Sequence, residues 1–306
     1  MVEDMPESEA QRVSVLRKII ATNHRFARGL IERAESSFGP SWTLDFESVL
    51  ASLFASDDDL AAAAKGYSAF AFDSMRQQKA FEQTRKYKNR TYAEVAQEVY
   101  LNESHMLSEY LPGLLLSHYL WPHHYRQIQF FDTAFLAPMS RSDRPEFSEV
   151  GIGTAAFSRR VLERIDCARG QGYDISPSSC QYAQAHVASI GASGRYIVNC
   201  QDILVNTIAP TPWLICVEVL EHLENPLEFL RALRAAVAPG GRAFITAAVN
   251  AAHADHIYLY RNAHEVEQQL IEAGFAIEQG FSASAFAPPE VGVPVPVAAA
   301  FVVYPV

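Results

Sequence analysis

The sequence predicts an α/β fold in which a seven-stranded, mostly parallel sheet follows an all-helical N-terminal region. Up to residue 140 the apolar residues recur at helical spacing. From Phe147 onwards, short apolar runs alternate with amphipathic stretches, and this alternation is typical of parallel strands joined by covering helices. The last two runs are joined by a Pro-rich segment, which predicts an antiparallel hairpin at the C-terminal edge of the sheet.

These patterns divide the chain into two expected parts. Residues 1–140 are expected to form a helical cap that covers a ligand, mediates dimerisation, or both, and residues 141–306 a ligand-binding domain. The seven expected strands lie within the apolar runs 147–153, 169–175, 195–200, 213–220, 242–249, 275–281 and 297–306.

Turn and capping signals divide the N-terminal part into helices. Helical spacing of apolar residues extends from Val13 to Phe38, and Gly39-Pro40 then marks a turn. A run of acids from Asp57 predicts a helix start, because carboxylates stabilise helix N-termini. Pro112-Gly113 is expected to break the helical stretch that follows.

Composition narrows the class of protein. The 306 residues carry a formal net charge of -10, which argues against a nucleic-acid surface built on clustered Lys and Arg. No apolar run approaches the length of a membrane span, and the acidic, polar N-terminus does not resemble a signal peptide. We therefore expect a cytoplasmic protein whose four cysteines, without metal-type spacing, stay reduced: Cys167, Cys180, Cys200 and Cys216.

Three strand ends carry residues suited to a nucleotide-like ligand. The first strand ends in Glu149 and a glycine turn with Gly151 and Gly153, which lets the backbone approach a ligand closely. Asp174 ends the second strand and can accept the hydroxyl protons of a ribose. Asp202 ends the third strand and can meet an adenine amino group. The alternatives are a structural turn, a helix cap at Asp174 and a solvent-facing acid at Asp202.

The fourth strand and its continuation, residues 217–250, resemble a known family. Glu221-His222, the helix-starting Pro226 and the turn Pro239-Gly240-Gly241 match the segment that follows the fourth strand in class I S-adenosylmethionine-dependent methyltransferases. Residues 265–279 are similar to the last helix and sixth strand of that family. The resemblance implies a Rossmann-like sheet and S-adenosylmethionine as cofactor. It also disfavours a nicotinamide dehydrogenase, which shares the glycine turn and the strand-end acid.

The resemblance implies roles for individual residues. The sequence departs from the family's glycine motif at Ala155, which stands where the family has its third glycine. Tyr125 and Arg126 lie just before the first strand, where a helix of the family covers the cofactor. The cofactor-binding residues implied in this way are Glu149, Gly151, Gly153, Asp174, Ile175, Asp202, Ile203, Glu218, Val219 and Tyr125.

The chemistry of methyl transfer needs an aligned acceptor and, for a hydroxyl, a base or a metal. His222 is the candidate base, and its alternative is a structural, hydrogen-bonded histidine. Glu218, Glu221 and His222 also match the ExxEH pattern of quinol O-methyltransferases of ubiquinone synthesis and of small-RNA 2′-O-methyltransferases. There a further histidine follows the fifth strand, here His256 or His253, and such a set suits Mg, Mn or Fe(II). The same string also occurs in metal-free members of the superfamily.

The sequence thus predicts an enzyme that methylates a small molecule, at an oxygen of an aromatic or natural-product-like acceptor from specialised metabolism. Two alternatives stay open. One is a small-RNA 2′-O-methyltransferase, against which the acidic charge counts. The other is a non-catalytic protein that binds S-adenosylmethionine, towards which Ala155 alone points. The acceptor, the methylated atom and a homodimer formed through the cap are not determined by the sequence.

Overall fold

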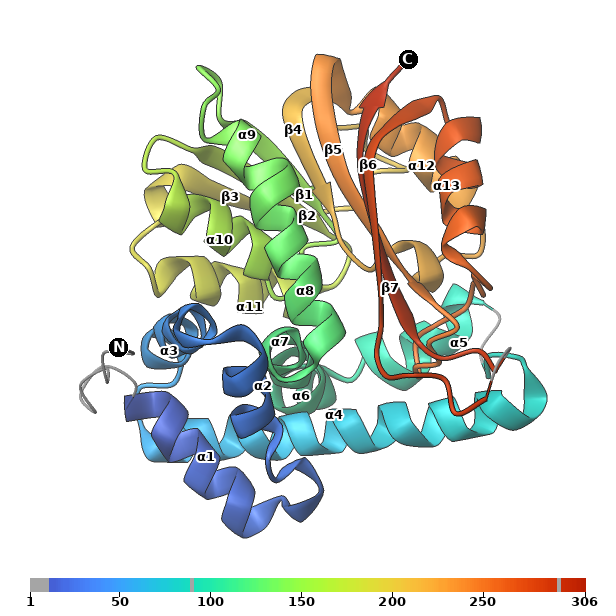
Figure 1. The fold of residues 1–306 in the computed structure, drawn as a ribbon. Coiled ribbons are helices and arrows are strands. Elements are labelled where there is room, and N and C mark those ends of the chain that lie inside the picture. Colours follow the sequence, from blue (N-terminus) through green and yellow to red (C-terminus); the bar gives the residue numbers. More distant parts are fainter. Residues whose placement is uncertain (1–10, 89–90, 291–292) are drawn as a thin grey trace.

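The sheet of the computed structural model has seven strands in the order β3-β2-β1-β4-β5-β7-β6 (Figure 1). The structure describes residues 11–88, 91–290 and 293–306. The five strands β1 to β5 run parallel, whereas β7 lies antiparallel between β5 and β6, so the expected mostly parallel sheet with a C-terminal hairpin is confirmed. The strands are β1 (Glu146–Val150), β2 (Arg169–Asp174), β3 (Tyr196–Cys200), β4 (Thr211–Cys216), β5 (Val237–Val249), β6 (Phe275–Ser284) and β7 (Val297–Pro305).

Helices cover both faces of the sheet because the buried strands are apolar on both sides. In β5, Phe244 packs on one face with residues of α8 and α10, and Ile245 packs on the other face with residues of α12 and α13. The same alternation continues in β7, where Val302 and Val303 pack on opposite faces of the sheet. The covering helices are α8 (Pro122–Phe131), α10 (Ala156–Arg164), α11 (Pro177–Ala188), α12 (Pro226–Ala235) and α13 (Ala263–Glu272).

The N-terminal region is helical, and its long helix α4 (Asp57–Thr84) extends beneath the carboxyl ends of the parallel strands (Figure 1). As expected from the acids at its start, α4 begins with a capping box in which Ser56 and Asp59 bond each other's backbone amides. The remaining helices are α1 (Gln11–Asn23), α2 (Leu30–Phe38), α3 (Pro40–Leu53), α5 (Tyr92–Val95), α6 (Glu103–His105), α7 (Leu111–Leu120) and α9 (Ala137–Met139).

One expected break is wrong, and one expected turn lies within the bounds of a strand. Pro112-Gly113 does not break a helix, because Pro112 lies in the first turn of α7, where its missing N–H is harmless, and helix continues through both residues. Gly113 instead allows close packing, since a Cβ there would lie 2.4 Å from the Cβ of Phe70 in α4. Pro239-Gly240-Gly241 lies inside the bounds of β5, where the register with β4 shifts between Val237 and Arg242, so the turn still leads into the stretch 242–249.

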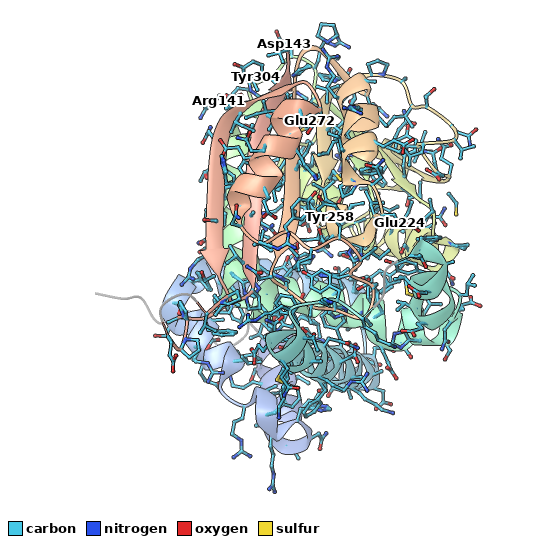
Figure 2. All side chains as sticks on the ribbon, turned by 90° about the vertical axis from the view of Figure 1, so that its right-hand side faces the viewer. Arg141, Asp143, Glu224, Tyr258, Glu272 and Tyr304 are labelled. Atoms are coloured by element: carbon cyan, nitrogen blue, oxygen red, sulfur yellow. The ribbon has the colours of Figure 1, made fainter. Side chains whose placement is uncertain are left out.

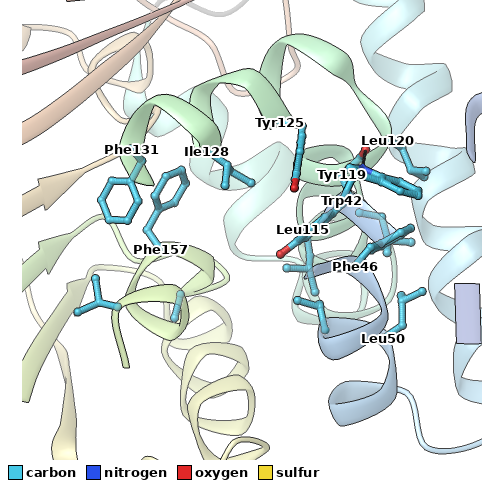
Figure 3. Packing of buried hydrophobic residues seen from close by; sticks show 14 of the residues in the cluster. Trp42, Phe46, Leu50, Leu115, Tyr119, Leu120, Tyr125, Ile128, Phe131 and Phe157 are labelled. Carbon is cyan, nitrogen blue, oxygen red and sulfur yellow. Dashed lines mark hydrogen bonds between the residues drawn. The ribbon is translucent and has the colours of Figure 1, made fainter. Parts of the chain in front are cut away.

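Ion pairs of Arg160 connect the helical region to the sheet domain. Arg160 of α10 is nearly buried and binds Asp45 of α3 at 2.7 Å and Asp132, which follows α8. Tyr125 donates a hydrogen bond to the same Asp45 at 3.0 Å. Around this point the two parts share one apolar core, in which rings of α3, α7 and α8 interlock (Figure 3).

Two further expectations concern the cysteines and the membrane. The four cysteines are free thiols. Among the described residues, no helix is both long enough and apolar enough to pass through a bilayer.

The Arg160 ion pairs give a first prediction. Arg160→Met is expected to lower the free energy of unfolding by about 3 kcal/mol, because it leaves Asp45 and Asp132 without their buried partner. Arg164→Met is the matched control: Arg164 pairs with the same Asp45 but is half exposed, so we expect a loss below about 1 kcal/mol. Urea denaturation of both variants measures the difference, and equal losses would contradict this account.

Candidate active site

A cavity of ≈ 960 Å³ separates the carboxyl ends of the strands from the helical region. The sheet contributes the loops after β1, β2, β3 and β4, which is where parallel α/β sheets bind their ligands. The opposite wall comes from α4, α7, the start of α8 and the segment 92–110. Phe286, in the loop between β6 and β7, contributes to the lining as well. The two predicted parts of the chain therefore enclose one site together.

The glycine turn after β1 forms the floor of this cavity. Gly151 and Gly153 have φ angles of 72° and 45°, in the left-handed region that favours glycine. A Cβ at Gly151 would lie 2.3 Å from a methyl group of Val219, so only glycine fits there. Ala155, which stands where the family has its third glycine, has a φ of 56° and so also lies in the left-handed region, with the strain of a side chain added.

The strand-end acids expected to bind the nucleoside lie around the same space. Asp174 accepts hydrogen bonds from the amides of Gly153 at 3.0 Å and Ser176 at 2.9 Å, so its carboxylate holds the glycine turn in place. Burial raises its pKa. The alternative role as a helix cap belongs to Ser176, whose side chain caps α11. Ile175, Asp202 and Ile203 line the cavity beside it.

Glu149 lies deeper, at the end of β1. Its carboxylate accepts hydrogen bonds from the amide of Ser158 at 2.8 Å and from the Ser158 hydroxyl. The side chain is almost fully buried, and this burial raises the pKa of Glu149 to about 8. The raised pKa favours the protonated form of this carboxyl group.

A cluster of Glu221, His222 and His256 lies above the end of β4. One potential ligand atom from each residue falls within 4.8 Å of the other two. The Nδ1 atoms point away from the cluster, that of His222 to the backbone oxygen of Asp255 at 3.0 Å and that of His256 to the oxygen of Ala251 at 2.6 Å. The Nε2 atom of His222 lies 3.8 Å from a Glu221 oxygen. Each imidazole therefore offers its Nε2 to the cluster.

Glu221 is the unusual member of this cluster. It is fully buried, and neither carboxylate oxygen has a hydrogen-bond partner among the residues that the structure describes. Burial and the nearby Glu218 raise its pKa well above the usual range. A buried carboxylate without well-formed hydrogen bonds is unstable as an anion, and a proton or a cation at this position would stabilise it.

Two of the residues considered as metal ligands are hydrogen-bonded to other groups. Glu218 is adjacent to Glu221, but its carboxylate accepts hydrogen bonds from Thr246 at 2.6 Å and Gln127 at 3.1 Å. Of the two histidines considered, His256 joins the cluster, whereas His253 binds Asp255 through its Nδ1 at 2.9 Å.

Asp255 is a site residue that the sequence analysis missed. It is completely buried and accepts hydrogen bonds from the hydroxyl groups of Tyr100, at 3.2 Å, and Tyr110. Burial disfavours its ionised form, but contacts with His222 and His253 outweigh burial and hold the pKa of Asp255 well below its usual range. The His-x-Asp-His spacing at 253–256 is the one local signal that pointed to it.

Tyr125 corrects the expectation for the helix before β1. Its ring is buried against Phe38 and Tyr119, and its hydroxyl binds Asp45 instead of lining the cavity (Figure 3). The reason is helical periodicity: α8 turns His123 and His124 towards the cavity, so Tyr125 faces α3. Arg126 likewise lies over the ring of Phe38, 5.9 Å from its centroid.

The helical region closes over the strand ends through a backbone contact as well. Glu224, labelled in Figure 2 where the sheet domain meets the helices, accepts a hydrogen bond from the amide of Tyr92 at 2.9 Å. Burial raises the pKa of Tyr92, and the nearby carboxylates of Asp174 and Asp202 raise it further. The segment that starts at Tyr92 is thus part of the wall facing the expected nucleoside site.

Part of the chain is similar in sequence to known proteins. Residues 148–243 match a family model described as a methyltransferase domain. The ubiquinone biosynthesis O-methyltransferase of Idiomarina loihiensis is 32% identical over 103 residues, which is 32% of this chain and 40% of that protein. Its counterpart from Xylella fastidiosa is 27% identical over 99 residues. The chain thus spans about two fifths of the length of these curated relatives.

Solved structures extend the similarity to the whole fold. Mitomycin 7-O-methyltransferase superposes with a TM-score of 0.56 at 13% identity, over 97% of this chain and 95% of that one. Human N-acetylserotonin methyltransferase also reaches a TM-score of 0.56 at 13% identity, over 80% of this chain and 70% of its own. The family model thus identifies residues 148–243 with a methyltransferase domain, and the two solved structures share the overall fold of the chain.

The buried carboxyl group of Glu149 gives a second prediction. An acid whose pKa is raised on folding stabilises the fold fully below its unfolded pKa and loses that contribution as the pH rises through the folded pKa. With a folded pKa of about 8, wild type should lose stability relative to Glu149→Gln between about pH 4.5 and pH 8. Urea denaturation of both proteins from pH 4 to pH 9 measures this, and a pH-independent difference would contradict it.

Proposed function

We propose that this protein transfers a methyl group from S-adenosylmethionine to a hydroxyl oxygen of a small aromatic or natural-product-like molecule. The observation that carries the proposal is the buried Glu221 beside the imidazoles of His222 and His256, in the same cavity as the glycine turn. A hydroxyl acceptor needs such proton-accepting or metal-binding groups, whereas a more nucleophilic nitrogen needs them less. The O-methyltransferases among the relatives and structural neighbours support this choice.

Each strand end has a defined task in this proposal. The bare backbone at Gly151 and Gly153 lets the cofactor lie against the turn. Asp174 accepts hydrogen bonds from the ribose hydroxyls, and Asp202 with Ile203 binds the adenine. Glu149 would lie near the methionine end of the cofactor, whose positive charge would favour the ionised form of this carboxyl group. Ile175, Glu218 and Val219 complete the cofactor-binding surface.

The protein needs only to align the acceptor hydroxyl with the methyl group and to remove the hydroxyl proton. S-adenosylmethionine supplies an electrophilic methyl group whose bonding electron pair stays on the sulfur as the methyl leaves. His222 accepts the hydroxyl proton at Nε2 while the acceptor oxygen forms its bond to the methyl carbon. Asp255 positions His222, since its backbone oxygen at 3.0 Å and its Oδ2 at 3.3 Å favour the tautomer with the proton on Nδ1. The helical region acts as the lid that excludes water.

A divalent cation fits the same residues. The unpartnered carboxylate of Glu221 and two imidazoles oriented by backbone oxygens form a donor set that Mg, Mn or Fe(II) accepts. Glu221, His222 and His256 would hold the ion, and Glu218 lies next to them, bound to Thr246 and Gln127. A bound ion would lower the pKa of an acceptor hydroxyl and so assist its deprotonation.

The proposed cofactor gives a third prediction. S-adenosylmethionine or its demethylated product should raise the Tm of wild type. At a ligand concentration of 100 times Kd, the free energy of unfolding should increase by about 2.7 kcal/mol. Asp174→Asn should weaken binding at least tenfold, because the ribose loses its charged acceptor. Asp166→Asn, an exposed acid outside the cavity, is the control and should bind normally. A wild type whose Tm does not respond to either nucleotide would remove the basis of the proposal.

The metal gives a fourth prediction with two opposite effects. Without metal, Glu221→Gln should raise the Tm, because it removes a buried carboxyl group that lacks donors. With Mn²⁺ or Mg²⁺, wild type should gain stability and both Glu221→Gln and His256→Ala should lose that gain. Thermal shift titrations measure both effects. If chelators and added ions leave the Tm of wild type unchanged, the site works through His222 without a metal.

A further inference from the structure

A buried histidine contacts the glycine turn from outside the cavity. His186 lies in α11 and is completely buried, and its Nδ1 atom lies 2.6 Å from the backbone oxygen of Thr154. Because a carbonyl oxygen can only accept a hydrogen bond, Nδ1 carries the proton and donates it. Thr154 itself lines the cavity, so this hydrogen bond holds a part of the cavity floor from its outer side.

A histidine at this position is unfavourable unless the hydrogen bond to Thr154 is needed. Burial and the nearby charge of Arg159 lower the pKa of His186 to about 3, so the ring is neutral and its one proton is on Nδ1. The Nε2 atom is then a buried acceptor, and the described part of the chain offers it no hydrogen-bond partner. An unpaired buried acceptor destabilises a fold, and an apolar side chain would avoid it. The donor at Nδ1 therefore accounts for the histidine.

The hydrogen bond acts on the peptide unit that sets the conformation of Ala155. The carbonyl group of Thr154 and the amide of Ala155 belong to one planar peptide unit and so rotate together. The amide donates to the backbone oxygen of Ile152 at 2.6 Å, while the carbonyl oxygen accepts from His186. Both ends of this peptide unit are therefore held, and its rotation would break both hydrogen bonds.

Ala155 needs this restraint because its backbone is left-handed. A φ of 56° is unfavourable for a residue that has a Cβ, whereas glycine adopts it freely. If the carbonyl of Thr154 were released, the peptide unit would rotate towards the backbone angles that alanine prefers. The turn between Gly153 and α10 would then lose the shape that it has in the cavity floor.

We infer that His186 is a positioning residue of the cofactor site, which holds the peptide unit between Thr154 and Ala155 and so allows an alanine where the family has its third glycine. The inference rests on the proposed binding of S-adenosylmethionine to the glycine turn. It also gives Ala155 a meaning other than a loss of catalysis. The turn keeps its shape through a side chain of α11 instead of through a glycine.

Calorimetric titration with S-adenosylhomocysteine tests this inference through two variants of equal shape. Asn and Leu side chains have the same outline, but only Asn places an N–H donor where His186 has its Nδ1 atom. We expect His186→Asn to bind S-adenosylhomocysteine about tenfold more tightly than His186→Leu. Val187→Ala, at a buried neighbour in α11 outside the cavity, is the control for lost packing, and its affinity should stay within threefold of wild type.

A glycine at position 155 provides the second test. In an Ala155→Gly background the left-handed backbone needs no restraint, so the difference between His186→Asn and His186→Leu should fall below threefold. A purely structural role of His186 in the core would leave that difference unchanged. Should His186→Leu fail to fold, His186→Phe, which keeps a flat ring without a donor, takes its place with the same expected differences.

The outcomes separate this inference from the proposed function. If wild type does not bind S-adenosylhomocysteine, the proposed function fails and the inference fails with it. If wild type binds but His186→Asn and His186→Leu have equal affinities, the inference alone is overturned. The same holds if Val187→Ala loses as much affinity as His186→Leu, or if the tenfold difference persists in the Ala155→Gly background.

Discussion

Asp255 is a buried carboxylate without a Lys or Arg partner among the described residues, and much of the site is arranged to keep it charged. Two tyrosine hydroxyls from the segment 96–110 and two histidines from the strand ends meet at its oxygens. A carboxylate without water needs several hydrogen-bond donors. If either the segment 96–110 or the loops with the two histidines moved away, Asp255 would lose donors in an apolar interior. The carboxylate of Asp255 therefore links the helical region to the cluster of Glu221, His222 and His256. The orientation of His222 depends on this carboxylate and on the tyrosines that hold it.

The fold could be predicted from the sequence because its signals are local. Alternating apolar runs located the seven strands, and Glu149, Asp174 and Asp202 were recognisable from their places at strand ends. The cluster of Glu221, His222 and His256 was also accessible, because two members are adjacent and the third lies in the loop after the next strand. These residues come together through the strand topology, and the topology followed from the alternation of elements.

The opposite wall of the cavity could not be predicted. Tyr110 meets Asp255 from 145 residues away, and Phe70 reaches His253 from a different helix of the cap. Only the packing of helices decides such contacts, and sequence spacing does not reveal it. Tyr125 shows the same difficulty: its position before β1 was correct, but the rotation of α8 placed its neighbours His123 and His124 in the cavity. Gly113, which suggested a break, is required by the close approach of α7 to α4.

The place of β7 has a consequence for how the chain is made. Although β7 is the last strand in the sequence, it lies between β5 and β6. During synthesis, the edge of β5 that pairs with β7 stays unpaired until about fifty further residues have been added to the chain. An unpaired, apolar strand edge is a template for association with other nascent chains. Expression at low temperature or with chaperones that shield nascent chains should therefore favour soluble material more than any change near the ligand cavity.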